Sequence, residues 1–80
     1  MSFSIATNNF GQMPNQAFGE LEGKPFYFRA RHGGWCLRVA EKGADPVADG
    51  VVIAHGENEL AGWWDEGDAR KFLEIVLNGL

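Results

Sequence analysis

Hydrophobic and polar residues alternate on both sides of a glycine pair in residues 25–40, which read PFYFRARHGGWCLRVA. Such alternation is typical of strands with one buried face, because successive side chains of a strand point to opposite sides. Glycine also tolerates the positive φ angles of a two-residue hairpin turn. We therefore predict a β-hairpin with strands at about 25–31 and 35–40 and its turn at Gly33-Gly34.

The predicted register separates the side chains of the hairpin by chemistry. One face is apolar and would join the core; it carries Phe26, Phe28, Ala30, Leu37 and Val39, with Trp35 closing it at the turn. The other face carries Tyr27, Arg29, Arg31, Cys36 and Arg38. Because the first set accounts for folding, the second set is available to solvent or to a partner.

The same register places Arg29 directly opposite Arg38. Like charges opposed across a strand pair are destabilising unless negative charge lies nearby. Three sources of that charge stay open: acidic residues of this chain, an acidic protein partner, or a phosphate backbone. The acidic residues considered for this role are Glu20, Glu22 and Glu41.

A third strand is expected at residues 50–55, GVVIAH, which form a β-branched run after a loop that contains Asp45-Pro46. The short connection from the hairpin predicts antiparallel pairing in a meander. Two sets of its side chains are candidates for the core: Val52 and Ala54, or Val51 and Ile53.

A C-terminal helix is predicted at about 66–78 from the spacing of its apolar residues, which are Ala69, Phe72, Leu73, Val76 and Leu80. Asp65 is a suitable N-cap, and the acidic residues that follow it favour the positive end of the helix dipole. Gly79 is a suitable terminator.

Residues 1–24 allow two interpretations. In one, a short strand at 2–6 precedes a short helix from Pro14 to Glu22. In the other, the segment is an extended arm that packs its phenylalanines, Phe3, Phe10 and Phe18, over the edge of the domain. With either interpretation, the predicted fold class is α+β: a three-stranded antiparallel meander packed on one face by the C-terminal helix.

Length and composition indicate one small globular domain, residues 1–80. The chain is 45% hydrophobic and 22% charged, which is ordinary for an ordered protein. The sequence after Met1 contains neither a signal peptide nor an apolar run of membrane-spanning length, so we expect a cytoplasmic protein without membrane contacts. The single cysteine, Cys36, fits a reducing compartment.

Charge is divided unevenly along the chain. Residues 1–40 hold four cations and two acids, a net charge of +2, whereas residues 41–80 hold three cations and nine acids, a net charge of −6. If the fold preserves this division, one surface is basic and another is acidic; the alternative is that the two halves neutralise each other. An acidic surface repels nucleic acid and attracts a cationic partner, so direct binding of nucleic acid is the less favoured expectation.

Candidate catalytic chemistry is limited to Cys36 with His32 and His55. A thiol nucleophile needs a base within hydrogen-bond reach, and the predicted register places Cys36 and His32 on different faces. These residues lack the close paired spacing of zinc ligands, and the glycines are scattered beside acids that would repel phosphate. We therefore expect no enzyme activity, no metal site and no cofactor.

In its overall profile the chain resembles small inhibitors encoded by phages and mobile elements, of the anti-CRISPR type. The shared features are the small size, the acidic net charge of −4, and a short sheet with a helix but no catalytic set. The resemblance implies an inhibitor in the host cytoplasm that binds a CRISPR-Cas or other nucleic-acid-processing complex and blocks its DNA- or RNA-binding surface. It assigns no residues. Charge and aromatic character select these candidate partner-binding residues: Tyr27, Arg29, Arg31, Arg38, Asp45, Asp49, Glu57, Glu59, Trp63, Asp65 and Glu66.

Two other functions stay open. One is a structural or regulatory module that forms a homodimer through an apolar strand edge or the second face of strand 50–55. The other is weak binding of nucleic acid through Arg29, Arg31 and Arg38.

Overall fold

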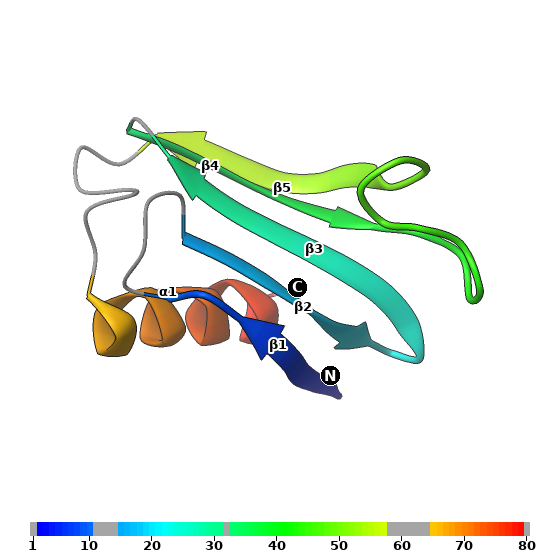
Figure 1. Cartoon of the computed structure of the whole chain (residues 1–80), viewed down its shortest axis with the longest axis horizontal. Helices are drawn as coiled ribbons and strands as arrows, with labels where there is room; N and C mark the ends of the chain where they lie inside the picture. Colours follow the sequence, from blue (N-terminus) through cyan, green and yellow to red (C-terminus); the bar gives the residue numbers. More distant parts are fainter. Residues whose placement is uncertain (1, 11–14, 32, 58–64, 80) are drawn as a thin grey trace.

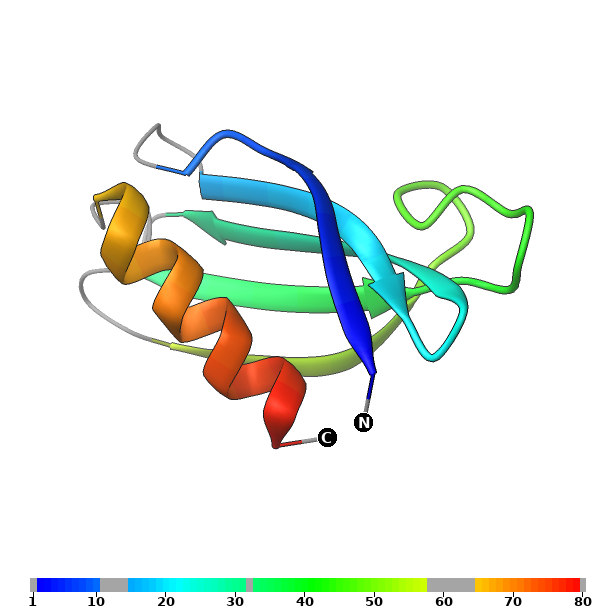
Figure 2. The ribbon, with the colours of Figure 1, turned by 90° about the horizontal axis from the view of Figure 1, so that it is seen from below.

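Five strands and one helix appear in the computed structural model, which describes residues 2–10, 15–31, 33–57 and 65–79. The strands form one antiparallel sheet in the order β1-β2-β3-β4-β5. The elements are β1 Phe3–Asn8, β2 Asn15–Leu21, β3 Lys24–Arg31, β4 Gly34–Val39, β5 Val51–Glu57 and α1 Glu66–Asn78. Figure 1 and Figure 2 show that α1 lies across one face of the sheet, whereas no described element covers the opposite face.

The sheet corrects the predicted fold class, because a three-stranded meander is wrong. The strands expected at 25–31, 35–40 and 50–55 correspond to β3, β4 and β5, but β1 and β2 add two more strands at the N-terminal edge. The strand expected at 2–6 lies largely within β1. The helix expected over 14–22 is wrong, because β2 occupies most of that range.

A two-residue alternation explains why β2 is a strand. Its buried residues are every second one, Asn15, Ala17, Gly19 and Leu21, and the residues between them are less buried. A helix would spread these four positions around its circumference and could not bury them together. Glu22 and Gly23, with φ angles of 53° and 79°, then form a tight turn that joins Leu21 to Lys24.

The close approach of β1 to β2 depends on Gly19. A Cβ atom at this position would collide with the carbonyl oxygen of Ser4 and would lie 2.8 Å from the ring of Phe26. A β-bulge between Ile5 and Thr7 interrupts the pairing of the two strands. The N-terminal segment is thus part of the sheet, which replaces the expectation of an arm laid over its edge.

The β3–β4 hairpin has a register two residues away from the predicted one. Arg31 pairs with Gly34, and Arg29 pairs with Cys36 instead of another arginine. The predicted turn at Gly33-Gly34 is wrong: Gly33 has a positive φ of 79°, but Gly34 already belongs to β4. A slip of one residue would exchange the two faces, whereas a slip of two preserves them. The predicted division of side chains between the faces is therefore correct.

Two physical reasons favour the observed hairpin register. It removes the direct opposition of two arginines, which would be destabilising. It also sets Ala30 opposite Trp35, so that the largest side chain of the hairpin faces a small one. The prediction of a Gly-Gly turn rested on the positive φ angles that glycine tolerates and on the separation of the two faces, which a slip of two residues preserves.

The hydrophobic core lies between the sheet and α1. Its largest fully buried apolar side chains are Phe26, Phe28, Leu37, Leu73 and Leu77. Burial of each contributes about 1.5–3 kcal/mol relative to exposure. The ring of Phe72 extends this core, with its centroid 6.3 Å from that of Phe28 and 5.1 Å from that of Trp35.

The predicted bounds of α1 are confirmed. The side chain of Asp65 accepts a hydrogen bond of 2.8 Å from the backbone N–H of Asp68, and Gly79 is the C-cap. The buried helix positions are Ala69, Leu73 and Leu77; the predicted core residue Leu80 lies outside the described residues. Within the described ranges, no helix has the length and apolar character that crossing a membrane requires.

Strand β5 is an edge of the sheet and is poorly covered. Val51, Val52 and Ile53 are 67%, 41% and 44% exposed. Ala54 packs against the core, and a β-bulge at Ile53 interrupts the pairing with β4. Neither of the two predicted core-facing pairs is therefore buried as a set, because only Ala54 reaches the core.

Candidate binding site on the open sheet face

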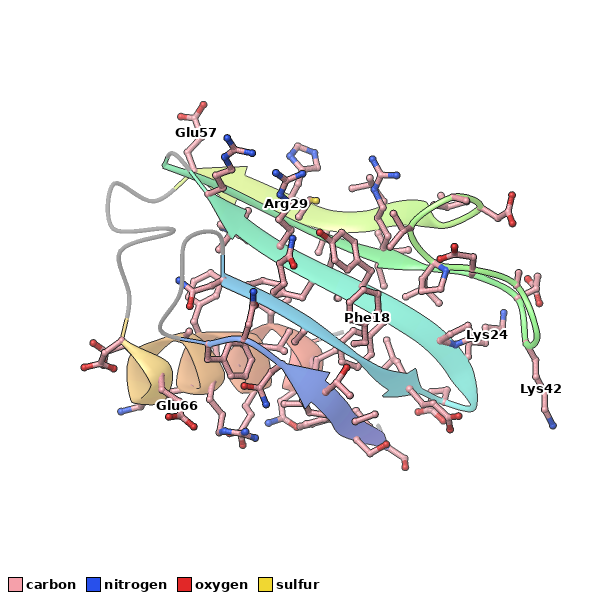
Figure 3. The ribbon with its side chains drawn as sticks, in the orientation of Figure 1. Phe18, Lys24, Arg29, Lys42, Glu57 and Glu66 are labelled. Carbon is pink, nitrogen blue, oxygen red and sulfur yellow. The ribbon has the colours of Figure 1, made fainter. Side chains whose placement is uncertain are left out.

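The uncovered side of the sheet, which we call the open face, carries polar and aromatic side chains. These residues alternate along the central strands with the buried ones, and so point away from α1. The open face comprises Gln16, Phe18, Tyr27, Arg29, Arg31, Cys36 and Arg38, and it continues on β5 with His55 and Glu57. Figure 3 shows Arg29 and Glu57 on this side of the sheet and Glu66 at the start of α1, on the other side.

Arg29, Arg31 and Arg38, which we call the arginine row, occupy successive steps along the sheet. Arg29 and Arg31 are two residues apart in β3, a separation of about 6–7 Å along the strand. Arg38 lies opposite Tyr27 on β4, one step further from the hairpin turn than Arg29. The three cations are thus staggered on one face, where an extended ligand can contact them in sequence.

The acids predicted to neutralise this row have other roles or positions. Glu41 forms an ion pair with Lys24 at 3.5 Å, and Glu22 accepts a hydrogen bond of 3.2 Å from the backbone N–H of Ser2. Glu20 lies opposite Pro25, at the end of the sheet that is far from the β3–β4 turn. Among the described residues, no arginine of the row forms an ion pair.

The hydrogen bonds of the arginine row also leave donors available. Arg38 donates from Nη1 to the carbonyl oxygen of Val47 at 3.3 Å. The Nε of Arg29 is buried and has no hydrogen-bond partner among the described residues. A buried donor without a partner costs free energy in the unbound chain.

A pocket of about 390 Å³ lies beside the arginine row and is lined by Arg29, Arg31, Gly34, Trp35 and Cys36. We call it the arginine pocket. A Cβ atom at Gly34 would lie in ordinary van der Waals contact with the carbonyl oxygen of Arg31, at 3.8 Å. Arg29 and Arg31 are the two charged residues of the lining, and most of the exposed lining is apolar.

An aromatic pair adjoins the arginine row. The ring centroids of Phe18 and Tyr27 are 4.9 Å apart and their planes are inclined by 37°. Gln16 donates from Nε2 to the hydroxyl of Tyr27 at 3.0 Å, which fixes the ring of Tyr27. Tyr27 is buried and Phe18 is 37% exposed, so Phe18 presents the accessible aromatic surface.

A second pocket of about 230 Å³ lies beside Phe18, and we call it the amide pocket. Its lining consists of Thr7, Asn8, Asn9, Gln16 and Phe18. The side-chain oxygen of Asn9 accepts a hydrogen bond of 2.7 Å from the backbone N–H of Gln16. The side-chain oxygen of Asn8 accepts one of 3.3 Å from the backbone N–H of Phe10. Their amide nitrogens, with the Thr7 hydroxyl and the Gln16 oxygen, supply donors and acceptors to a ligand.

The acidic candidates are not brought together. Asp45 and Asp49 lie in the loop that precedes β5, whereas Glu57 ends that strand. Asp65 and Glu66 lie at the start of α1, on the covered side of the sheet, where Asp65 acts as the helix cap. Glu59 and Trp63 lie outside the described residues. Of the predicted partner-binding residues, the structure places Tyr27, the arginine row and Glu57 on one face, with Glu57 on the edge strand β5.

Cys36 and His55 are cross-strand partners on the open face. Their side chains form no hydrogen bond in the described part of the chain, and His32 lies outside that part. Among the described residues, no three of His, Cys, Asp or Glu gather closely enough to hold a metal ion. The pairing of Cys36 with His55 follows from the observed register, which the sequence did not predict.

Comparison of the chain with protein-family models, with curated proteins and with solved structures finds no match. The functional inference therefore depends on the residues and geometry of the open face.

Proposed function

We propose that this chain is a binding module, without catalysis of its own, that takes an anionic partner on the open face of its sheet. The observation that supports this proposal is the arginine row, three cations on one uncovered face without a carboxylate partner among the described residues. The chain as a whole is acidic, with a net charge of −4. A concentration of positive charge on one face is therefore a local property that orients an anion toward that face.

Repulsion among the three arginines also argues for a ligand on this face. Three guanidinium groups within one patch repel each other, and an anion that bridges them removes this repulsion and supplies acceptors for their donors. The strands that carry these residues are paired in one sheet, so the backbone positions of the three arginines are fixed relative to each other before the partner arrives. Such preorganisation reduces the entropy lost on binding.

The inhibitor hypothesis stays a prediction. It relied on acidic residues acting together against a cationic partner, and the described acids among its candidate residues lie in separate places: the loop before β5, the end of β5 and the start of α1. The open-face proposal keeps Tyr27 and the arginine row and reverses the charge expected of the partner. It favours one of the two alternative functions expected from the sequence, which is binding through Arg29, Arg31 and Arg38.

Binding to immobilised polyanions tests the proposal. The probes are a poly-glutamate peptide, polyphosphate and a single-stranded oligonucleotide, each at low and high salt. We expect at least one to be retained, with an affinity that falls as salt rises. Replacing Arg31 and Arg38 by Gln should weaken this binding at least about tenfold, since each contact to a charged group contributes about 1.5–3 kcal/mol.

The matched control replaces Lys42 and Lys71 by Gln. This pair removes the same charge from two exposed positions, one in the loop after β4 and one on α1. We expect the lysine variant to bind like the unmodified chain. Failure of all three probes to bind at low salt, or equal weakening by the two double variants, would overturn the proposal.

A further inference from the structure

The arginine pocket and the amide pocket are adjacent on the open face. Gln16, which lines the amide pocket, is the direct cross-strand partner of Arg29, which lines the arginine pocket. Neighbouring strands are about 4.8 Å apart, so the two pockets approach each other to about one strand spacing at Gln16 and Arg29. A single ligand can therefore occupy both pockets if it carries an anionic group close to a hydrogen-bonding group.

Phe18 determines what kind of hydrogen-bonding group fits beside it. Its ring is partly exposed, rests on Tyr27 and forms one wall of the amide pocket. A fixed aromatic ring with free surface favours a planar ring system that stacks on it. Aliphatic or carboxylate side chains gain less from this surface.

The amide pocket has the size and chemistry for one planar heterocycle. Its volume of about 230 Å³ is below the 300–1,000 Å³ that encloses a drug-sized ligand. Three side-chain amides and a hydroxyl, from Asn8, Asn9, Gln16 and Thr7, offer both donors and acceptors. Nucleobase edges present the same mixture of donors and acceptors, and amide side chains pair with them.

We infer that the anionic partner is a single-stranded nucleic acid, with one base stacked on Phe18 in the amide pocket and neighbouring phosphates on the arginine row. This inference rests on the proposed function, because it needs the open face to be the binding surface. Arg29 and Arg31 contact phosphate oxygens through the arginine pocket, and Arg38 contacts the backbone further along the sheet. The staggered spacing of the row matches a ligand whose charges repeat along its length.

A single strand fits these features better than the other polyanions. In a duplex the bases are stacked inside the helix and cannot reach Phe18 unless they are extruded. An acidic peptide would satisfy the arginines but has no heterocycle for the amide pocket. Glu20 and Glu57 lie toward opposite ends of the open face, where their carboxylates repel a polyanion. A polyanion therefore contacts only the part of the face between them.

Fluorescence anisotropy with the full chain tests the inference. The probe is a labelled single strand of about 10 nucleotides of mixed sequence, a length within the range that sheet domains bind. It is compared with an abasic strand of the same length, a duplex of the same sequence and a poly-glutamate peptide. We expect the single strand to bind most tightly and the abasic strand to bind at least about fivefold more weakly, because base stacking is lost.

Two variants separate stacking from general packing. Phe18→Leu keeps an apolar cover over Tyr27 but removes the aromatic ring, and it should weaken binding of the single strand at least about fivefold. Phe18→Tyr keeps the ring and should bind within about twofold of the unmodified chain. On the abasic strand, all three proteins should bind alike. Circular dichroism of each variant verifies that it is folded.

The outcomes distinguish this inference from the proposed function. Equal binding of the abasic strand, tighter binding of the peptide or the duplex, or no effect of Phe18→Leu would overturn the nucleic-acid inference while the open face remained an anion-binding surface. Absence of binding to every polyanion at low salt would overturn both.

With three phosphate contacts, the logarithm of the affinity should fall with the logarithm of the salt concentration with a slope of about −2.

Discussion

Arg29 lies directly opposite Cys36 across β3 and β4, and not opposite Arg38. The like-charge pair that the alternative register would create is thus removed by two residues of stagger, without a carboxylate from this chain. Positive charge is therefore retained on the open face at a reduced cost in repulsion. This relationship leads to a direct chemical test, because Cys36 lies in the wall of the arginine pocket.

Coupling a bulky neutral maleimide to Cys36 should block binding of polyanions. The adduct would occupy the space between Arg29 and Arg31 and Gly34, and we expect the affinity to fall at least about tenfold, or about 1.4 kcal/mol. Anisotropy of a labelled polyanion measures the effect. Cys36→Ser, treated with the same reagent, is the control and should bind normally. Unchanged binding by the fully labelled protein would place the site elsewhere.

The hydrogen bond between Gln16 and the Tyr27 hydroxyl should stabilise the aromatic pair. Tyr27→Phe removes this bond of 3.0 Å, and the free energy of unfolding should fall by about 0.5–1.5 kcal/mol. Urea titration of a double-mutant cycle with Gln16→Met isolates the interaction from other effects of the two changes. Purely additive effects of the two substitutions would show that the bond does not contribute.

Gly19→Ala should destabilise the fold because β1 passes close to this residue. The added methyl group would collide with the Ser4 carbonyl oxygen and crowd the ring of Phe26, at a cost of about 1–3 kcal/mol in the free energy of unfolding. Gly67→Ala in α1 is the contrasting control, since its Cβ would lie 3.6 Å from its nearest neighbour, Oδ1 of the N-cap Asp65, which is an ordinary contact. That substitution should stabilise the protein by about 0.5–1 kcal/mol. Thermal and urea unfolding give the free energy of unfolding of the two variants. Equal changes in the two would contradict the β1–β2 pairing.

Asp65 should matter for stability and not for binding. Asp65→Ala removes the cap bond to the Asp68 N–H and should lower the free energy of unfolding by about 0.5–2 kcal/mol. Asp65→Asn keeps an acceptor oxygen and should be near neutral. Neither change should weaken binding of a polyanion, because Asp65 lies on the covered side of the sheet. Loss of binding with Asp65→Asn would assign Asp65 to the interface.

The helix and the two faces of the hairpin could be predicted because each depends on a local pattern. Helical spacing and an N-cap define α1, and side-chain alternation in β3 and β4 survives a slip of two residues. The register itself could not be derived from the turn residues, since registers that differ by two residues keep the same faces. The observed register sets Ala30 opposite Trp35 and separates Arg29 from Arg38.

The N-terminal strands were harder to predict. One interpretation of the sequence placed a short helix from Pro14 to Glu22, a range that includes Gly19. In the structure Gly19 allows close strand contact and Gly23 completes a turn with Glu22. The signal that could have identified β2 was the alternation of Ala17, Gly19 and Leu21 with larger or polar residues.

The candidate site was predicted in part for the same reason. Tyr27 and the arginine row were placed on one face from the hairpin alone. Phe18 and the amide pocket were missed, because they join that face only when β1 and β2 pair beside β3. Residues supplied by long-range strand pairing carry no local signal of their partners.

An NMR titration of the ¹⁵N-labelled protein with a polyanion tests the central claim most directly. The side-chain Nε–H signals of Arg29, Arg31 and Arg38 report on the open face, and that of Arg70 on α1 serves as an internal control. We predict shifts in the three signals of the arginine row, which weaken as salt is added, and little change at Arg70. Saturable binding that shifts Arg70 or the loop before β5 and leaves the arginine row unchanged would contradict the claim.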